Sequence, residues 1–343
     1  MRAVTFQAAE QVRVDEKPEP RLEAGDDAIV RIEASGICGS DLHIYHGRVP
    51  VEQGFTIGHE FVGSVLAVGE DVERVAVGDR VLGCFHTACA TCSSCLRGDY
   101  HRCRNGQTFG HGSKLGDLQG AQAEQLLVPR ANLTLRKVPE GMSAEVALFA
   151  GDVMGTGYHA VAHAGMLPGD SVVVLGLGPV GLCAVQAALA GGAAQVFAID
   201  TVAERLALAG KFGATAIHLT EDDPKRAVRA ATDGGADVVV DAVGDPGPLE
   251  LAVSLARDAG TVSGIGAYAG RGEVPLGLAW LKGLQLRLGL ANVIAHVDRV
   301  LALLEAGKLD PAPLVTHHMP LDQAAEAYEL YDRREALKIV LTP

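Results

Sequence analysis

The stretch that decides the fold is Gly176-Leu177-Gly178-Pro179-Val180-Gly181. It follows the β-branched run Val172–Leu175, leads into an uncharged helical stretch, and is followed by a second apolar run that ends at Asp200. Strand, G-x-G-x-x-G turn, helix and acid-terminated strand together form a dinucleotide-binding fingerprint. The glycines allow a tight turn and bring the pyrophosphate close to the N–H groups at the start of the helix.

Asp200 selects between the two nicotinamide dinucleotides. We expect its carboxylate to accept hydrogen bonds from the adenosine ribose and to repel a 2′-phosphate, and no Arg or Lys follows it before Arg205. NAD is therefore predicted in preference to NADP. The alternative is that the glycines serve only helix–strand packing and that Asp200 is a solvated loop acid.

The sequence around this motif alternates between strand-like and helix-like patterns, which is typical of an α/β domain with a doubly wound parallel sheet. The expected strands are 171–175, 195–199, 216–219, 237–240 and 261–265, and the expected helices are 182–190, 202–212, 223–231 and 248–259. No charged residue lies between Asp170 and Asp200, a length that could span a bilayer. Its glycines and two β-branched runs favour a buried strand, helix and strand instead.

The sequence before about residue 150 has a different character. Short β-branched or alternating runs, such as 28–32, 61–68 and 80–82, are separated by glycines and prolines, which indicates a β-rich domain. After the α/β region, the sequence predicts helices over 296–306 and 321–332 and a final strand over 337–341.

Composition narrows the class of protein. The chain has 343 residues, of which 48% are hydrophobic and 21% charged, and its formal net charge is −13. These values exclude a disordered chain, and the acidic balance and 4% aromatic content disfavour nucleic-acid binding. Seven cysteines do not suit a fully paired disulfide framework, and no cleavable signal segment is evident at the N-terminus. We expect a protein of the reducing cytoplasm that binds neither membranes nor nucleic acid.

Four of the cysteines lie close together in the sequence, at Cys89, Cys92, Cys95 and Cys103. Three thiolates at successive i, i+3 spacing can surround one ion, and the fourth can complete a tetrahedron. Zinc is the predicted metal, with an iron–sulfur cluster as the weaker alternative. A site with four protein ligands has no open position, so its zinc would be structural.

A second, dispersed set of ligand types is Cys38, His59 and Asp152. One thiolate, one imidazole and one carboxylate leave the fourth position of a zinc ion open for substrate, as a catalytic site requires. Each residue alone has an ordinary reading as well: a lone cysteine is usually a small core residue, and His59-Glu60 could be a surface pair.

These motifs together resemble those of the zinc-dependent medium-chain dehydrogenase/reductase superfamily, over essentially the whole chain. The residues that carry the resemblance are Gly36–Asp41, Gly58–Gly63, Val77–Val81, Cys89–Cys103 and Gly176–Gly181. The sequence is most similar to bacterial NAD-dependent alcohol dehydrogenases. The resemblance implies a GroES-like β-rich catalytic domain (1–152, with a structural zinc lobe at about 84–110), a Rossmann NAD-binding domain (153–291), and a C-terminal return (292–343) that completes the catalytic domain.

The resemblance also implies roles for individual residues. Cys38, His59 and Asp152 would hold a catalytic zinc, with Glu60 as an exchangeable ligand and Asp152 in the position where some members have cysteine. Ser40 and His43 match the family's proton relay; otherwise they are a turn cap and a surface residue. Lys338 matches a basic position near the cofactor pyrophosphate, and an exposed lysine on the last strand is the alternative. The expected cofactor-binding residues are Gly176, Gly178, Pro179, Val180, Gly181, Asp200, Arg205 and Lys338.

The predicted function is hydride transfer between NAD(H) and a primary or secondary alcohol, or the matching aldehyde or ketone. Two zinc ions per chain are expected, one catalytic and one structural. Polyol (sorbitol-like) and threonine-type dehydrogenases are the neighbouring alternatives, and a non-catalytic NAD(H)-binding zinc protein is an alternative of a different class. For bacterial members the resemblance suggests a homotetramer.

Overall fold

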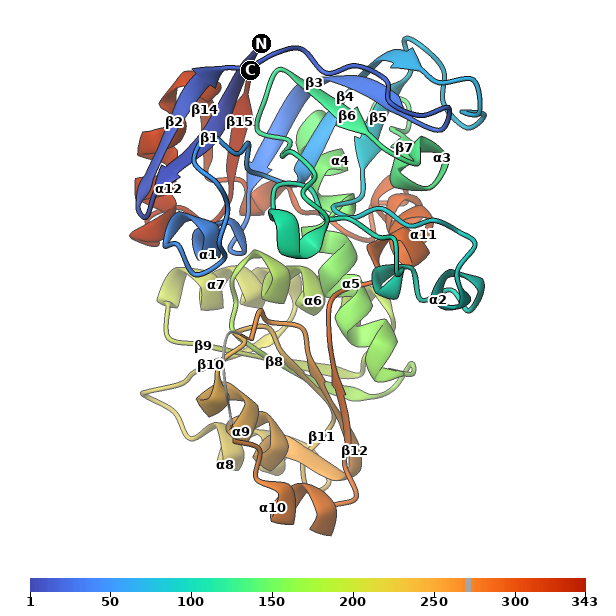
Figure 1. Ribbon diagram of the computed structural model, residues 1–343. Helices are drawn as coiled ribbons and strands as arrows, with labels where there is room; N and C mark the ends of the chain where they lie inside the picture. The colour runs from blue at the N-terminus through green and yellow to red at the C-terminus, as the bar shows by residue number, and fades with distance from the viewer. Residues whose placement is uncertain (269–272) are drawn as a thin grey trace. The chain divides into compact units, whose positions relative to one another are not determined.

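The chain divides into two compact units. The first unit consists of Met1–Asp152 and Asn292–Pro343, and the second consists of Val153–Ala291. The structure is a computed structural model that describes residues 1–268 and 273–343. No helix within these two ranges is long and apolar enough to cross a membrane. The uncharged stretch that raised this question forms β8, α6 and β9 (Figure 1).

The first unit is built on a seven-stranded sheet with the order β14-β15-β3-β4-β5-β7, in which β6 also pairs with β3. A separate two-stranded sheet joins β1 and β2. The strands are β1 (Arg2–Ala8), β2 (Gln11–Glu16), β3 (Ala28–Ile37), β4 (Glu60–Val68), β5 (Arg80–Gly83), β6 (Gln125–Val128), β7 (Leu135–Lys137), β14 (His317–Pro320) and β15 (Ile339–Thr342). The α-helices are α1 (Asp41–Tyr45), α2 (Ser93–Leu96), α3 (Ala131–Thr134), α4 (Ala144–Ala150), α11 (Val293–Glu305) and α12 (Ala324–Asp332). Short 3-10 turns are η1 (Tyr100–Arg102), η2 (Ser113–Leu115), η3 (Ala312–Leu314) and η4 (Leu321–Gln323).

Strand β3 shows how the sequence shapes this unit. Its first half alternates between the buried Val30 and Ile32 and the exposed Arg31 and Glu33, which is the pattern of a sheet with one face in water. Its last four residues, 34–37, are all buried. The C-terminal strand β15 pairs antiparallel with this second half, and Ile339 lies opposite Ile37 at the end of β3.

The second unit is a six-stranded parallel sheet with the order β10-β9-β8-β11-β12-β13. Its strands are β8 (Ser171–Leu175), β9 (Gln195–Asp200), β10 (Thr215–His218), β11 (Ala236–Asp241), β12 (Ala256–Gly264) and β13 (Gln285–Leu288). Its helices are α5 (Val153–Ala164), α6 (Pro179–Ala190), α7 (Ala203–Phe212), α8 (Pro224–Ala231), α9 (Pro246–Leu255) and α10 (Leu276–Leu281). The chain order runs outward from β8 in one direction and from β11 in the other, so the topological switch point lies between these two strands.

All five residues of β8 are buried, which explains the continuous apolar run in its sequence. Val173 and Leu175 pack in a core with Leu249 and Val253 of α9. Val172 and Val174 point to the opposite face of the sheet because side chains alternate along a strand, and they are buried as well. Both faces of the sheet are therefore covered, and the predicted doubly wound fold is confirmed.

One predicted boundary is wrong. The helix expected over 248–259 ends at Leu255, and β12 begins at Ala256, earlier than the strand expected over 261–265. The ammonium group of Lys282 explains this end, since it donates to the carbonyl oxygens of Val253, Ser254 and Ala256 at 3.2, 3.1 and 2.5 Å. These carbonyls of the last turn are therefore satisfied without another turn of helix.

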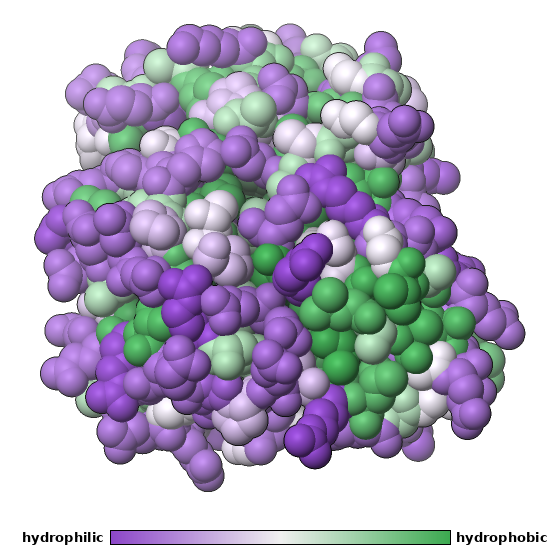
Figure 2. Space-filling model, turned by 90° about the horizontal axis from the view of Figure 1, so that it is seen from above, coloured by the Kyte–Doolittle hydropathy of each residue, from purple (hydrophilic) through white to green (hydrophobic). Residues whose placement is uncertain are grey.

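One face of the molecule is largely hydrophilic (Figure 2). Figure 2 shows a face on which hydrophilic residues predominate and hydrophobic residues gather toward one side. Acidic residues outnumber basic ones by 42 to 29 over the whole sequence.

Candidate metal centres and dinucleotide site

Four side chains with metal-ligand chemistry converge in the first unit. Cys38 follows β3, His59 precedes β4, Glu60 begins β4, and Asp152 follows α4. One ligand atom from each of them lies within 4.8 Å of the others. The pairing of β3 with β4 explains part of this convergence, because it sets Gly36 opposite Glu60.

The donor set fits a zinc ion of the catalytic type, with sulfur, imidazole nitrogen and carboxylate oxygen available. Burial raises the pKa of the Cys38 thiol, with the charge of Asp152 adding to the effect. Burial also raises the pKa of Glu60 to about 7, against the opposing charge of Lys338. The second carboxylate oxygen of Glu60, Oε2, is buried and has no hydrogen-bond partner. A bound cation would give the free carboxylate oxygen a partner, and its charge would stabilise the ionised forms of the buried thiol and carboxyl groups.

Lys338 lies at this site and is fully buried. Its ammonium group forms an ion pair with Oε1 of Glu60, donates to the carbonyl oxygen of Ile37 at 3.1 Å, and lies 5.7 Å from the ring centre of Phe149. Burial alone would lower the pKa of Lys338, but Glu60 raises it. The alternative of an exposed lysine on the last strand is therefore wrong. The pairing of β15 with β3 carries Lys338 to this position.

Asp41 supports the histidine of this cluster, a role that the sequence analysis did not assign. Its Oδ1 lies 3.1 Å from Nδ1 of His59, an ion-pair contact rather than a well-formed hydrogen bond. Its Oδ2 accepts from the backbone amide of Cys38 at 2.9 Å. Burial alone would lower the pKa of His59, but Asp41 and Asp152 raise it well above its usual value. A carboxylate behind a ligating histidine sets the orientation of the ring, so the position of Asp41 next to Cys38 was the available signal.

His111 is the second residue that the sequence analysis missed. Its ring lies 4.9 Å from that of His59, edge to face. Its Nδ1 lies 2.9 Å from the carbonyl oxygen of Phe109. Burial and the neighbouring His59 lower the pKa of His111, so the ring is neutral beside the metal-ligand cluster at neutral pH. No spacing along the chain marks this residue, because a loop brings it to the site.

The predicted relay residues begin helix α1. Ser40 is the residue before the helix, and its hydroxyl oxygen lies 3.3 Å from Nε2 of His59. His43 lies in the helix, half-buried, and its backbone amide donates to the carbonyl oxygen of Ser40 at 3.1 Å. Ser40 is thus next to the candidate ligands, and His43 is one helical turn further along the chain.

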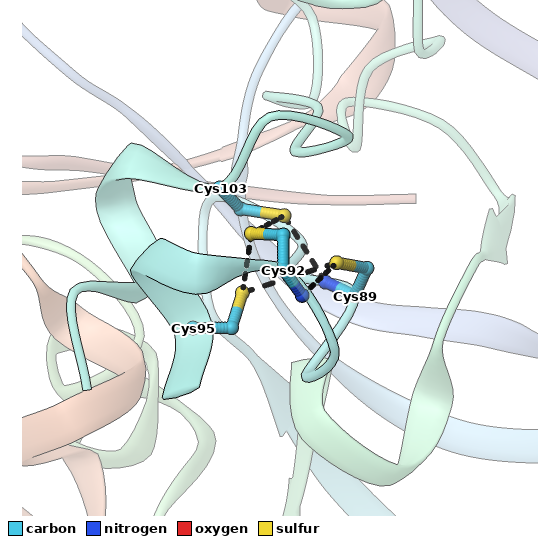
Figure 3. A group of neighbouring side chains, drawn as sticks. All are labelled: Cys89, Cys92, Cys95 and Cys103. Atoms are coloured by element: carbon cyan, nitrogen blue, oxygen red, sulfur yellow. Dashed lines mark hydrogen bonds between the residues drawn. The ribbon is translucent and has the colours of Figure 1, made fainter. Parts of the chain in front are cut away.

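The four clustered cysteines form the second candidate metal site (Figure 3). Their sulfur atoms also lie within 4.8 Å of one another, with Cys92 3.5 Å from Cys95 and 3.9 Å from Cys103, and Cys89 4.0 Å from Cys95. A tetrahedral zinc with bonds of about 2.3 Å separates its sulfur ligands by about 3.8 Å, whereas a disulfide requires about 2.05 Å. The backbone amides of Cys92 and Cys89 point at the sulfurs of Cys89 and Cys103. A hydrogen bond from Thr91 lowers the pKa of Cys89 to about 5, which favours the thiolate.

In the second unit, the glycine motif follows β8 at the switch point of the sheet. Gly178 caps α6 and Pro179 begins it, so the amides of the first turn are open to an anion. A Cβ atom on Gly181 would lie 1.8 Å from the carbonyl oxygen of Gly176, so only glycine fits there. Val180 lies in the first turn of α6, and Arg205 is half-exposed on α7.

Asp200 ends β9 and is 8% exposed. Its Oδ2 accepts from the backbone amide of Leu177, inside the glycine motif, at 2.5 Å. Its Oδ1 accepts from the amides of Thr201 and Val202 at 2.7 and 2.9 Å. The reading of Asp200 as a solvated loop acid is therefore wrong: the carboxylate joins the glycine turn to the end of the neighbouring strand.

Comparisons with known proteins agree with this chemistry. The family descriptions "Alcohol dehydrogenase GroES-like domain" and "Zinc-binding dehydrogenase" match residues 24–140 and 179–305. The uncharacterized zinc-type alcohol dehydrogenase-like protein AdhB of Bacillus subtilis (strain 168) is 36% identical, with 100% of each chain covered. The solved alcohol dehydrogenase TADH from Thermus sp. ATN1 is 48% identical with a TM-score of 0.96, covering 100% of this chain and 99% of its own.

Two more distant solved structures, each 28% identical and covering 100% of this chain and 99% of their own, contain a nicotinamide cofactor. They are an alcohol dehydrogenase (rspB) from E. coli CFT073 with NADH, at a TM-score of 0.90, and a protein from Sinorhizobium meliloti 1021 with NADP, at 0.87. The predicted fold class, a GroES-like domain with a Rossmann-type parallel sheet, is thereby confirmed. The chain belongs to the zinc-dependent medium-chain dehydrogenase/reductase superfamily and is an oxidoreductase of the zinc-type alcohol dehydrogenase group.

Proposed function

We propose that this enzyme transfers hydride between NAD(H) and a small alcohol or its carbonyl product, at a catalytic zinc held by Cys38, His59 and Asp152. The observation that carries the proposal is the convergence of these three residues and Glu60 within 4.8 Å. A thiolate and a carboxylate offset the two charges of the ion, so the site is nominally neutral and can release product. The chemistry supplied by zinc is the stabilisation of negative charge on the oxygen of the alcohol or carbonyl.

The protein's own residues handle the proton that the alcohol loses. Ser40, whose hydroxyl lies 3.3 Å from Nε2 of His59, is close enough to the candidate ligands to relay that proton: its oxygen accepts the proton while the hydroxyl gives up its own toward His43. His43, one turn along α1, is the group proposed to pass it to solvent, because imidazole exchanges protons near neutral pH. Glu60 is proposed as an exchangeable ligand: Oε1 is held by Lys338, while Oε2 has no partner.

A second, structural zinc is proposed at Cys89, Cys92, Cys95 and Cys103, which makes two zinc ions per chain. The sulfur separations of 3.5 to 4.0 Å support this site. All four thiols would be ligands, so no position is open for substrate, and the ion would stabilise the irregular segment between β5 and β6.

NAD is proposed as the cofactor in preference to NADP. Gly176, Gly178, Pro179, Val180 and Gly181 would hold its pyrophosphate, with Arg205 as a further candidate contact. The ammonium of Lys338, which the resemblance placed near the pyrophosphate, is fully buried against Glu60 and is proposed to serve the metal-ligand cluster instead. The charge of Asp200 near the start of α7 would repel the 2′-phosphate of NADP.

The assembly is proposed to be a homotetramer in the cytoplasm. Strand β13 is an edge of its sheet, and Trp280 and Leu281 of the adjoining helix α10 are 84% and 75% exposed. Apolar side chains of this size beside an unpaired strand edge favour contact with a second copy. Seven cysteines, an odd number, do not suit a fully paired disulfide framework, which supports a reducing compartment.

Metal analysis combined with activity tests the catalytic proposal. Wild type is expected to contain two zinc ions per chain and to produce NADH from simple alcohols, and chelation of the catalytic zinc should abolish that activity. Asp152→Ala should lose one zinc and nearly all turnover, while Asp233→Ala, a change at an exposed acid, should lose neither. Full activity after complete removal of zinc would contradict the proposal.

A further inference from the structure

A chain of buried polar side chains leads away from the candidate catalytic zinc site to the C-terminal helix α12. Its members are Tyr328 of α12, Gln122 of the segment before β6, and Asp41 of α1, and all three are 0% exposed. The hydroxyl of Tyr328 donates to Oε1 of Gln122 at 3.0 Å. Nε2 of Gln122 donates to the carbonyl oxygen of Gly36 at 3.1 Å and, more weakly, to Oδ2 of Asp41 at 3.5 Å.

Chemistry fixes the direction of every donor in this chain. The Gly36 carbonyl and the Asp41 carboxylate can only accept, so the NH₂ group of Gln122 must face them. Its oxygen then faces Tyr328, which must donate. Burial and the charge of Asp41 raise the pKa of Tyr328 well above its usual value, so that the hydroxyl keeps its proton. The remaining step is the contact of 3.1 Å between Asp41 Oδ1 and His59 Nδ1.

Packing holds Gln122 in this place. A Cβ atom on Gly58 would lie 2.4 Å from Cγ of Gln122, and the φ of Gly58 is +92°. The glutamine side chain therefore occupies the space that a side chain on residue 58 would need, directly against the backbone that precedes His59. A change in the orientation of Gln122 would act on both the carboxylate and the backbone that set the position of His59.

We infer that Tyr328 and Gln122 are positioning residues, which orient Asp41 and through it His59 for metal binding. The inference rests on the proposed catalytic zinc site. Tyr328 fixes the amide of Gln122, the amide fixes one oxygen of Asp41, and the other oxygen of Asp41 faces His59. Partners behind a metal ligand commonly change metal affinity by about 10- to 100-fold when removed, and a residue one step further away should approach the lower figure.

The test uses Tyr328→Phe, which removes only the hydroxyl, with Tyr45→Phe as the matched control. The Tyr45 ring lies 5.4 Å from that of Tyr328 in the same core, and Tyr45 is 5% exposed. The rate of zinc release to a chromogenic chelator is measured, and the phase that is missing in Asp152→Ala identifies the catalytic site. Tyr328→Phe should speed this phase by up to about tenfold. It should also shift the absorption bands of the cobalt-substituted enzyme, whereas Tyr45→Phe should do neither.

Gln122→Met provides a second variant. If the chain acts as one unit, Gln122→Met combined with Tyr328→Phe should release zinc no faster than Gln122→Met alone. If Gln122→Met does not fold, the comparison of Tyr328→Phe with Tyr45→Phe decides the question. Folded Tyr328→Phe with wild-type zinc release and cobalt bands would overturn the inference, even if its melting temperature fell. A wild-type enzyme that binds no zinc at Cys38 would instead overturn the proposed function.

Discussion

Replacing Asp200 by asparagine should lower both the free energy of unfolding and the preference for NAD over NADP. The carboxylate accepts three backbone N–H groups, from Leu177 through Oδ2 and from Thr201 and Val202 through Oδ1. Asparagine has one acceptor oxygen. If that oxygen keeps the bonds to Thr201 and Val202, its NH₂ group faces the amide of Leu177, donor against donor.

The magnitude follows from these contacts. Leu177 is 0% exposed, so its unpaired amide should cost about 1–3 kcal/mol. The two remaining hydrogen bonds would be made to a neutral amide oxygen instead of a carboxylate, and we expect each to be roughly half as strong. We therefore expect Asp200→Asn to lower the free energy of unfolding by about 2–4 kcal/mol. The opposite orientation of the amide would leave two N–H groups unpaired and would not cost less.

Cofactor selection should change in the same variant. A negative charge about 4 Å from a 2′-phosphate charge costs about 4 kcal/mol at an effective dielectric constant of 20. Removing it should raise the ratio of NADP to NAD efficiency at least about tenfold, which corresponds to about 1.4 kcal/mol.

Urea unfolding of the apoprotein and initial rates with both cofactors measure the two effects. Asp233→Asn, at an exposed acid of the same unit, is the control and should match wild type in both. Wild-type stability of Asp200→Asn would refute the argument from the backbone bonds. An unchanged cofactor ratio would refute the role of the carboxylate in selecting NAD.

Three further changes should be informative. Cys103→Ser should reduce the zinc content by one ion per chain and lower the melting temperature. The control Cys84→Ala changes a buried thiol outside the cluster and should keep both zinc ions. Equal zinc content in the two variants would count against the structural site. Lys338→Met should lower the free energy of unfolding by about 3–5 kcal/mol, because it leaves Glu60 buried without its cation. In calorimetry, the double variant with Glu60→Gln should recover most of that loss. No recovery would show that the ion pair is not the cause. Burial alone would raise the pKa of Asp237, but hydrogen bonds from Ser171 and the charge of Arg257 lower it, so its stabilisation is present above the unfolded-state pKa and is lost as the pH falls through the folded-state value. Asp237→Asn should therefore differ from wild type in urea unfolding near pH 7, and the difference should shrink as the pH falls below about 3.8. A difference that is independent of pH would contradict this.

Local sequence was sufficient for the features whose partners lie nearby in the chain. The glycine motif, the strand before it and the helix after it are contiguous, so their period and turn chemistry predict the parallel sheet. The four clustered cysteines lie within one segment, and their spacing alone predicts a tetrahedral site. The end of the helix predicted over 248–259 was placed too late, because it depends on Lys282, which follows α10 in the sequence and donates to the carbonyl oxygens at the end of α9.

The site around His59 depended on tertiary structure. His111 and Gln122 have no distinctive spacing, and they approach Asp41 and His59 because separate loops converge at the ends of β3 and β4.

By itself, the sequence determined the kinds of ligand available, the cysteine lobe and the dinucleotide turn, because these rest on residue type and short-range spacing. Only the tertiary structure decided that Lys338 is buried against Glu60, and that Asp200 is held by the glycine turn. Both follow from strand pairing, β15 with β3 and β9 with β8, which joins residues far apart in the chain. The free energy of burying a charged side chain depends on which oppositely charged or hydrogen-bonding group is buried beside it. That group lies far away in the sequence, so no local pattern identifies it.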